Sequence, residues 1–285
     1  MKNLKYIRKI TEAYPYNYEN PPICKVELWD FSRANENDEA RKEAVCLVAS
    51  IDYDNEYCKD PDRFWNLLIE KGYENPFEFV REYSALNQTY NLRNEQLDTM
   101  TSIQEVTSTD YIRDMIDINR HNIATFKLKV PIFVARQIQR HRSFSYMEMS
   151  RRFVKGDKVK FEYWLRPEIC RYKEIIEDIY DEYEGDYKPE QLCSILPLGL
   201  YTQFWMQGDY KAWLNLFIHC LQLEIQEEVC LVIQSMWGLL KEYQPEIIET
   251  MADYIDEWTR DCNPMFRTAR KKKADWFREN FLGGE

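Results

Sequence analysis

Four arginines, a histidine, a glutamate and a serine gather in one short run of an otherwise acidic chain. The run spans 140–153 and contains Arg140, His141, Arg142, Glu148, Ser150, Arg151 and Arg152. Guanidinium groups are permanently charged and present planar donors that match phosphate oxygens two at a time. The serine hydroxyls of the run can donate to or accept from a nucleotide, whereas Glu148 must serve something other than phosphate. The run predicts binding of a phosphorylated ligand, and the other interpretation is a solvated basic helix end.

The elements before this run are expected to position it. Residues 126–135 are rich in β-branched and aromatic side chains and predict a strand, and residues 136–140 predict a helix. The basic run therefore follows a buried strand and a helix. Helices are also predicted over 37–52, 64–72 (ended by Gly72), 171–192 as a charged pair, and 210–243 as one or two long helices, while 1–40 is predicted to be irregular.

The run resembles the signature of the flavin-dependent thymidylate synthases, which is Arg-His-Arg, seven residues and then serine. Here these are residues 140–142, 143–149 and Ser150, with Glu148 two before the serine and 131–137 as a similar lead-in. Two further parts of the chain resemble the family. They are the segment Gly72-Tyr-Glu-Asn-Pro-Phe-Glu78, and 195–204 together with 213–215 and 222–225. The resemblance covers about residues 40–80 and 121–250.

The resemblance implies an α/β (α+β) fold, in which helices flank a mixed central β-sheet and flavin binds without a Rossmann motif. The chain contains no G-x-G-x-x-G sequence, which is compatible with that expectation. We expect one catalytic domain over 1–285, with an insertion at about 80–120 and a C-terminal helical extension at about 250–285. The insertion would be a lid over the site, an oligomer contact or a surface excursion.

The activity implied by the resemblance is reductive methylation of dUMP at C5, which gives dTMP. Methylenetetrahydrofolate would supply the carbon and NADPH would reduce FAD, which in turn would supply hydride. The family binds FAD between subunits of a homotetramer, so the same assembly is expected here. The site must hold a phosphate dianion, polarise the uracil and place the flavin ring close to the base.

The resemblance also assigns residues, position by position. Nucleotide contacts are expected from Gln137, Arg140, Glu148, Met149, Ser150, Arg151 and Arg152. Flavin contacts are expected from Asn75, Glu78, Arg140, His141, Arg142, Glu148 and Asn215. The candidates for a direct part in catalysis are Ser150, Arg151 and His219. Ser150 is expected to bind substrate rather than attack it, because no Ser-His-Asp constellation surrounds it.

Several positions depart from the family pattern. Cys193 and Cys220 stand where the family has arginines, the second of which assists ionisation of the uracil N3. Arg151 is an additional arginine that would compensate, and His219 would do so because its charge is tunable near neutral pH. A thiol near the base would alternatively act as a nucleophile, or the cysteines would simply pack.

Composition limits the function classes. The net charge of −11 argues against a nucleic-acid binder, and the basic segment 267–273 is typical of a solvated helix face. No apolar run is long enough for a transmembrane helix, and the first residues lack a signal peptide, so we expect a cytoplasmic protein without a membrane partner. The eight cysteines form no C-x-x-C pair and are expected to be reduced. Three histidines without a His/Cys cluster predict no metal site.

Two alternatives stay open at this stage besides a basic nucleic-acid-binding helix. One is a flavin-dependent C5-methylase of UMP or another pyrimidine nucleotide, which the altered arginine positions favour. The other is a relative that binds flavin or nucleotide without turnover.

Overall fold

The computed structural model describes residues 5–10, 22–31, 34, 37–53, 60–80, 123–150, 162–164, 172–220, 225–249 and 251–252. For a few of these, His219 and Cys220 among them, only the backbone is described. The predicted insertion at about 80–120, the pair Arg151 and Arg152, and the C-terminal extension lie outside the described residues.

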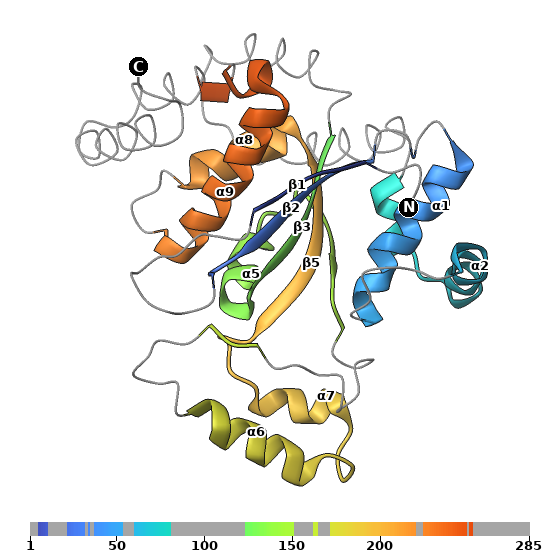
Figure 1. The fold of residues 1–285 in the computed structure, drawn as a ribbon, viewed down its shortest axis with the longest axis vertical. Helices are drawn as coiled ribbons and strands as arrows, with labels where there is room; N and C mark the ends of the chain where they lie inside the picture. Colours follow the sequence, from blue (N-terminus) through green and yellow to red (C-terminus); the bar gives the residue numbers. More distant parts are fainter. Residues whose placement is uncertain are drawn as a thin grey trace, which may run out of the picture.

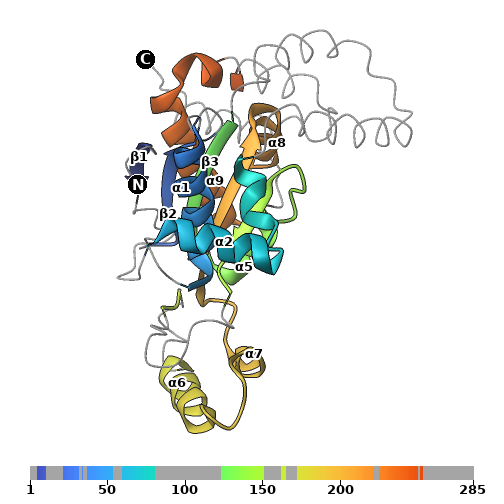
Figure 2. The same ribbon diagram turned by 90° about the vertical axis from the view of Figure 1, so that its right-hand side faces the viewer.

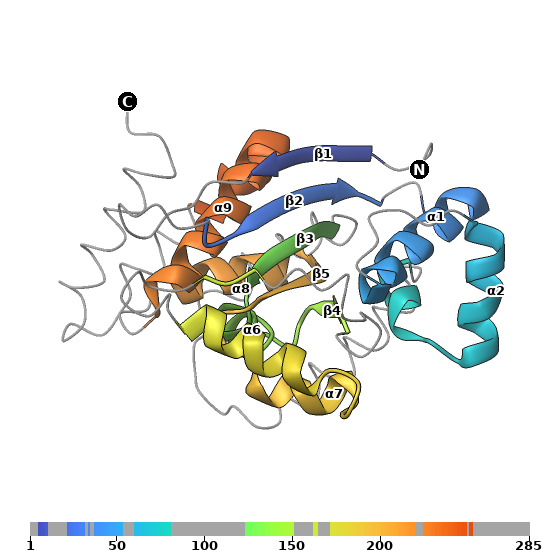
Figure 3. The same ribbon diagram turned by 60° about the horizontal axis from the view of Figure 1, so that its bottom comes forward.

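Five described strands form one sheet. They are β1 (Lys5–Ile10), β2 (Lys25–Asp30), β3 (Ile123–Pro131), β4 (Ser145–Glu148) and β5 (Tyr201–Asp209), in the order β1-β2-β3-β5-β4 (Figures 1 and 3). Helices flank this sheet, so the predicted α/β class is confirmed. Every described strand pair is antiparallel, so the sheet is not of mixed direction.

The irregular structure predicted for residues 1–40 is wrong for β1 and β2. In β2, Val26 and Leu28 are buried in the main core and alternate with Lys25 and Glu27, which pair with each other at 3.0 Å. This two-residue period is the ordinary pattern of a strand with one core-facing side. The prolines at 15, 21 and 22 favour irregular structure locally, and the pairing of β2 with β3 overrides this preference.

The described helices agree with most of the sequence-based expectations. They are α1 (Asp38–Ala49), η2 (Ser50–Tyr53), α2 (Pro61–Lys71), η3 (Asn75–Val80), α5 (Ile132–Ile138), α6 (Tyr172–Tyr183), α7 (Pro189–Leu192), η6 (Cys193–Ile195), α8 (Tyr210–Cys220) and α9 (Glu227–Tyr243). Gly72 ends α2 in the left-handed conformation at φ 65°, as expected of a C-terminal cap. The helix predicted to begin at residue 136 begins at Ile132, because Pro131 ends the strand and the helix buries Val134 and Ala135.

One face of the sheet is covered by α5, α8 and α9 (Figure 1). Alternate residues of β3 and β5, among them Phe126 and Phe204, point into an apolar cluster with the helices. Aromatic side chains form its centre: between ring centroids, Trp213 lies 4.9 Å from Phe126, and Phe217 lies 4.6 Å from Trp237. The hydrophobic cluster on this face is the larger of the two in the described part of the chain.

The opposite face is covered by α1, α2, η2 and η3 (Figure 2). Its cluster is centred on Trp205, which has no exposed surface. This face also buries polar groups: the Gln207 side chain donates to the Phe79 carbonyl at 3.0 Å and to the Thr125 hydroxyl at 2.8 Å. These two bonds tie η3 to the middle of the sheet.

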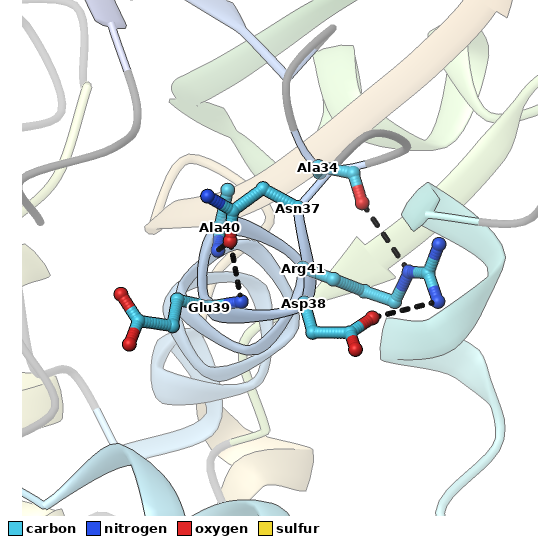
Figure 4. A network of polar contacts seen from close by, with 6 residues as sticks. All are labelled: Ala34, Asn37, Asp38, Glu39, Ala40 and Arg41. Atoms are coloured by element: carbon cyan, nitrogen blue, oxygen red, sulfur yellow. Dashed lines mark hydrogen bonds and ion pairs between the residues drawn. The ribbon is translucent and has the colours of Figure 1, made fainter.

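The start of α1 is defined by a local network (Figure 4). The Asn37 side chain accepts from the backbone N–H groups of Glu39 at 2.8 Å and Ala40 at 3.3 Å, as an N-cap residue does. The Arg41 guanidinium donates to the Ala34 carbonyl at 3.2 Å and lies 3.4 Å from Asp38. The network fixes the position of α1 and, through it, of η2, which follows without a break.

The cysteines differ in state. Cys24, Cys46 and Cys193 form no disulfide, whereas Cys230 is disulfide-bonded, so the expectation of reduced thiols is wrong for Cys230. Within the described part of the chain, no helix has both the length and the apolarity needed to cross a membrane. Among the same residues, no group of three or more His, Cys, Asp or Glu side chains is arranged to hold a metal ion.

Candidate functional site

The first part of the basic run, residues 140–144, forms a turn that leads from α5 into β4, at the edge of the described sheet. The Tyr146 hydroxyl lies 3.0 Å from the Ile138 carbonyl and 2.9 Å from the His141 carbonyl, and it donates to one or the other. Burial raises the pKa of Tyr146, so the hydroxyl keeps its proton throughout the physiological range. Tyr146 thereby holds the turn against the end of α5.

A glycine on the neighbouring strand makes room for this turn. Phe144 is buried, and its ring centroid lies 4.7 Å from that of Trp213. A Cβ atom built on Gly208 would collide with the Phe144 ring and would stand 3.3 Å from the Ala212 side chain. The position of the turn therefore depends on the absence of a side chain at residue 208.

The turn presents two exposed cations. Arg140 and Arg142 are both exposed, and neither has an ion-pair partner among the described residues. His141, between them, is half-buried. Because a guanidinium remains charged at any ordinary pH, two of them without acidic partners form a suitable surface for phosphate oxygens.

Glu148, the single carboxylate of the run, is held by two neutral donors. Its Oε1 accepts from the Thr202 hydroxyl at 2.7 Å, and its Oε2 accepts from the Gln139 amide at 3.0 Å. Thr202 lies on β5 and Gln139 caps the C-terminus of α5, so the adjacent strand and the preceding helix both orient this side chain. Glu148 is exposed and is thus an oriented acceptor next to the cationic turn.

The three remaining described residues of the predicted nucleotide set make different contacts. The Gln137 amide donates to the Gln226 side chain at 2.6 Å, which ties α5 to the start of α9. The Met149 N–H donates to the Gln203 carbonyl at 2.8 Å. The Ser150 N–H donates to the Asp52 carboxylate at 3.2 Å.

A cavity of about 290 Å³ lies on the α1 side of β4. It is lined by Ala49, Asp52, Phe64, Leu67, Leu68, Lys71, Tyr73, Pro76 and Met147. Its walls are mostly apolar, and they join β4 to η3, which also carries the predicted flavin contacts Asn75 and Glu78. Asn75 is exposed and Glu78 is half-buried. The structure thus brings this predicted segment beside the basic run across the sheet edge.

The remaining predicted site residues have no described contact with the basic run. Asn215 is exposed in the second turn of α8, and no hydrogen bond or ion pair among the described residues links it to the 140–150 segment. His219 and Cys220 are placed in α8 by their backbone alone. Cys193 is half-buried in η6. The suggested roles of Arg151 and His219 in place of an arginine therefore stay predictions.

Sequence reasoning missed the residues that support the site. Thr202, on β5, donates to Glu148. Tyr146, within the run, donates to the backbone at the end of α5 or at His141, and Gln139, one residue before Arg140, also donates to Glu148. Asp52 is 98 residues from its partner Ser150, and no local pattern marks it. Of these four residues, only Gln139 and Tyr146 are polar side chains beside or within the run, so only their positions in the sequence indicated a supporting role.

An antiparallel sheet flanked by helices carries at its edge a cationic turn beside an oriented carboxylate, an arrangement that suits a phosphorylated ligand. The family model described as thymidylate synthase complementing protein matches residues 82–246. The chain belongs to this family, and the resemblance predicted from the Arg140–Ser150 run is confirmed.

Several flavin-dependent thymidylate synthases are similar in sequence. The protein from Thermus thermophilus is 29% identical over 212 residues, which cover 66% of this chain and 74% of that protein. The protein from Thermotoga neapolitana is 27% identical over 151 residues, 47% of this chain and 68% of that protein. The match to the Pseudothermotoga lettingae protein, at 33% identity, spans only 51% of that protein's length and 33% of this chain.

Among solved structures, a UMP/dUMP methylase, PolB from Streptomyces cacaoi bound with 5-Br dUMP, overlaps 55% of this chain and 84% of its own. The sequence identity is 17% and the TM-score is 0.40.

Proposed function

We propose that this chain is a flavin-dependent thymidylate synthase, which methylates dUMP at C5 to give dTMP with methylenetetrahydrofolate and NADPH. The observation that carries the proposal is the Arg140–Ser150 run at the sheet edge. There Arg140 and Arg142 are exposed without acidic partners among the described residues, and Glu148 is oriented by Gln139 and Thr202. The names of the relatives support the same activity.

The residues of the site suit a flavin. A flavin dinucleotide has a diphosphate and a flat apolar ring system, and the described residues offer two exposed guanidinium groups beside an apolar cavity. Arg140, His141 and Arg142 would hold the phosphates, with Asn75, Glu78 and Asn215 as further contacts. When bound, FAD would supply the hydride that it receives from NADPH.

The chain's own residues would bind and orient the nucleotide. Arg140 would contact its phosphate, and Glu148 would accept a hydrogen bond from its sugar or base. Ser150 and Met149 would contact it from the end of β4, with Gln137 holding α5 in place through Gln226. The mostly apolar walls of the cavity would exclude water from one side of the site.

The test is tritium release from C5-labelled dUMP by the purified protein supplied with FAD, NADPH and methylenetetrahydrofolate. Release that is accompanied by dTMP is the expected result. No release from labelled dUMP or from labelled UMP, in a protein that binds flavin, would leave a non-catalytic relative as the assignment.

A pair of arginine variants sharpens this test. Arg142→Ala is expected to lower turnover by at least tenfold, because a charge-assisted phosphate contact contributes on the order of 1.5–3 kcal/mol. Arg63→Ala is the matched control: it removes an exposed arginine from α2, outside the cavity walls, and should leave turnover unchanged. Equal effects of the two changes would contradict the assignment of the basic run.

Methylation of UMP is the second candidate. It is favoured by Cys193 and Cys220, which occupy positions where the family resemblance expects arginines. Parallel assays with labelled UMP distinguish the two, since tritium release from UMP alone would identify a ribonucleotide methylase.

We propose further that the protein is a cytoplasmic homotetramer with its sites at subunit interfaces. Asn215 has no described link to the basic run, and a contribution from a neighbouring subunit would complete the flavin contacts. Light scattering of the flavin-bound protein should give a mass of four chains, and a monomer with full activity would contradict the assembly.

A further inference from the structure

The backbone N–H of Ser150 requires a partner outside the sheet. β4 lies at one end of the described strand order, and the Met149 N–H extends its ladder by donating to the Gln203 carbonyl at 2.8 Å. Successive N–H groups of an extended strand point to opposite sides, so the N–H of Ser150 points away from β5. A partly buried N–H that faces away from its sheet must be paired by some other group.

Asp52 is that group. Its Oδ1 accepts from the Ser150 N–H at 3.2 Å, and the residue is only 8% exposed. Asp52 lies in η2, directly after α1, and the preceding Ile51 is 2% exposed and belongs to the cluster of this face. The carboxylate is therefore fixed by the packing of α1 rather than by the strand that it serves.

We infer that Asp52 is a positioning residue for the nucleotide site: it fixes the chain at Ser150 and so sets the affinity for the pyrimidine nucleotide. The inference rests on the proposed function, in which Ser150 contacts that nucleotide. The charge of Asp52 would by itself oppose a phosphate nearby. Its contribution must therefore come from geometry, because the acceptor holds the segment in one conformation before the nucleotide arrives.

Two substitutions separate the acceptor from the charge. Asp52→Asn removes the charge but keeps an Oδ1 acceptor, whereas Asp52→Ala removes both. Asp62→Ala is the matched control, since Asp62 is an exposed carboxylate on α2 that pairs with Lys42 at 2.7 Å, away from β4. If Asp52→Ala does not fold, Asp52→Ser takes its place, because its shorter side chain does not reach the Ser150 N–H.

The first measurement is amide hydrogen exchange at Ser150 in the protein without nucleotide. Asp52→Ala is expected to speed exchange about tenfold, while Asp52→Asn and Asp62→Ala stay close to wild type. Unchanged exchange in Asp52→Ala would overturn the inference. So would equally fast exchange in Asp52→Asn, because the charge rather than the acceptor would then matter.

The second measurement is the dissociation constant of dUMP and of UMP by equilibrium dialysis, with KM and kcat beside it. Asp52→Ala should weaken binding of the substrate nucleotide about tenfold and raise KM in parallel, with kcat at saturation within about twofold of wild type. Asp52→Asn should restore the affinity. A loss of kcat with unchanged affinity, or a loss that simply follows a lower Tm, would overturn the inference.

Failure of the proposed function gives a different result. If the wild-type protein binds neither nucleotide, the proposed function fails, and the nucleotide part of the inference fails with it. If the wild type binds dUMP or UMP normally and Asp52→Ala binds it equally well, the positioning role alone is wrong.

Discussion

The two faces of the sheet are built differently. The face covered by α5, α8 and α9 is packed with aromatic and aliphatic side chains, among which Trp213, Phe217 and Trp237 have no exposed surface. The face covered by α1, α2 and η3 is smaller, buries the polar pair Thr125 and Gln207, and contains a cavity of about 290 Å³.

This difference indicates that one face mainly stabilises the fold and the other mainly forms the binding site. Dense apolar packing supplies most of the stability of a domain, whereas cavities reduce it and are common at binding sites, where polar groups are also found. The first face is therefore expected to determine whether the chain folds. The second is expected to determine what it binds. Substitutions on the two faces should affect different measurements.

The largest effect on stability is expected from Trp213→Ala on the densely packed face. The indole packs edge-on against Phe126 and Phe144, and its N–H donates to the Gly208 carbonyl at 3.0 Å. Its removal should lower the free energy of unfolding in urea by about 3–5 kcal/mol. Tyr172→Ala, which truncates an aromatic residue that is 47% exposed on α6, is the control and should change it by less than about 0.5 kcal/mol. Similar losses in the two variants would mean that the face is not the main source of stability.

Gly208→Ala should lower both the stability of the protein and its affinity for ligands. The added methyl group must displace the buried Phe144 ring, which overpacks the core at an expected cost of about 1–3 kcal/mol in urea unfolding. Because Phe144 belongs to the turn that carries Arg142, flavin and nucleotide affinity should fall as well. Gly238→Ala, where a Cβ meets nothing within 4 Å, is the matched control. Unchanged ligand affinity in a destabilised Gly208→Ala would show that the turn adapts independently.

A pH effect is expected from the buried thiol of Cys24, whose sulfur lies 3.8 Å from the Ser235 hydroxyl. Burial raises the pKa of Cys24 from 9.0 to about 12. Between these values the unfolded chain loses a proton that the folded protein retains, so stability is full below pH 9 and falls as the pH rises.

From pH 8 to pH 10, wild type should lose about 1.4 kcal/mol more unfolding free energy than Cys24→Ala. Cys193→Ala, at a half-buried position in η6, should keep the wild-type pH dependence. The same slope in wild type and Cys24→Ala would contradict the raised pKa.

The smallest effect is expected at the start of α1. Asn37→Ala removes the side chain that accepts from two backbone N–H groups, which should cost about 1 kcal/mol. Because α1 leads into η2, hydrogen exchange should rise over 38–53 and not in α9. Glu39→Gln changes an exposed side chain of the same turn and serves as the control. Exchange that rises equally in α9 would show that the two faces open together.

Much of the fold follows from local pattern. The apolar spacing of α8 and α9, the glycine that ends α2 and the acidic start of α1 are all visible in the sequence. The sequence predicts the start of α5 too late, because its β-branched residues favour a strand locally, while burial of Val134 and Ala135 favours the helix. The alternation of β2 is also present in the sequence, but the nearby prolines favour irregular structure.

Only the part of the candidate site that is continuous in the sequence could be predicted. The Arg140–Ser150 run is continuous, so its spacing alone indicated the family. The residues that hydrogen-bond to that run lie elsewhere in the chain. The pairing of β4 with β5 brings Thr202 to Glu148, and the packing of α1 brings Asp52 to Ser150. Such contacts depend on strand register and helix position, which a single sequence does not encode locally.

The pairing of β2 with β3 has a practical consequence for expression. The family match begins at residue 82, after β2 and η3, yet β3 bonds to β2 along most of its length. A fragment cut to the matched segment would expose the backbone donors and acceptors on that side of β3. It would also uncover Trp205 and the polar pair beneath η3. Such an unprotected strand invites pairing between molecules, so the fragment should aggregate where the full chain does not.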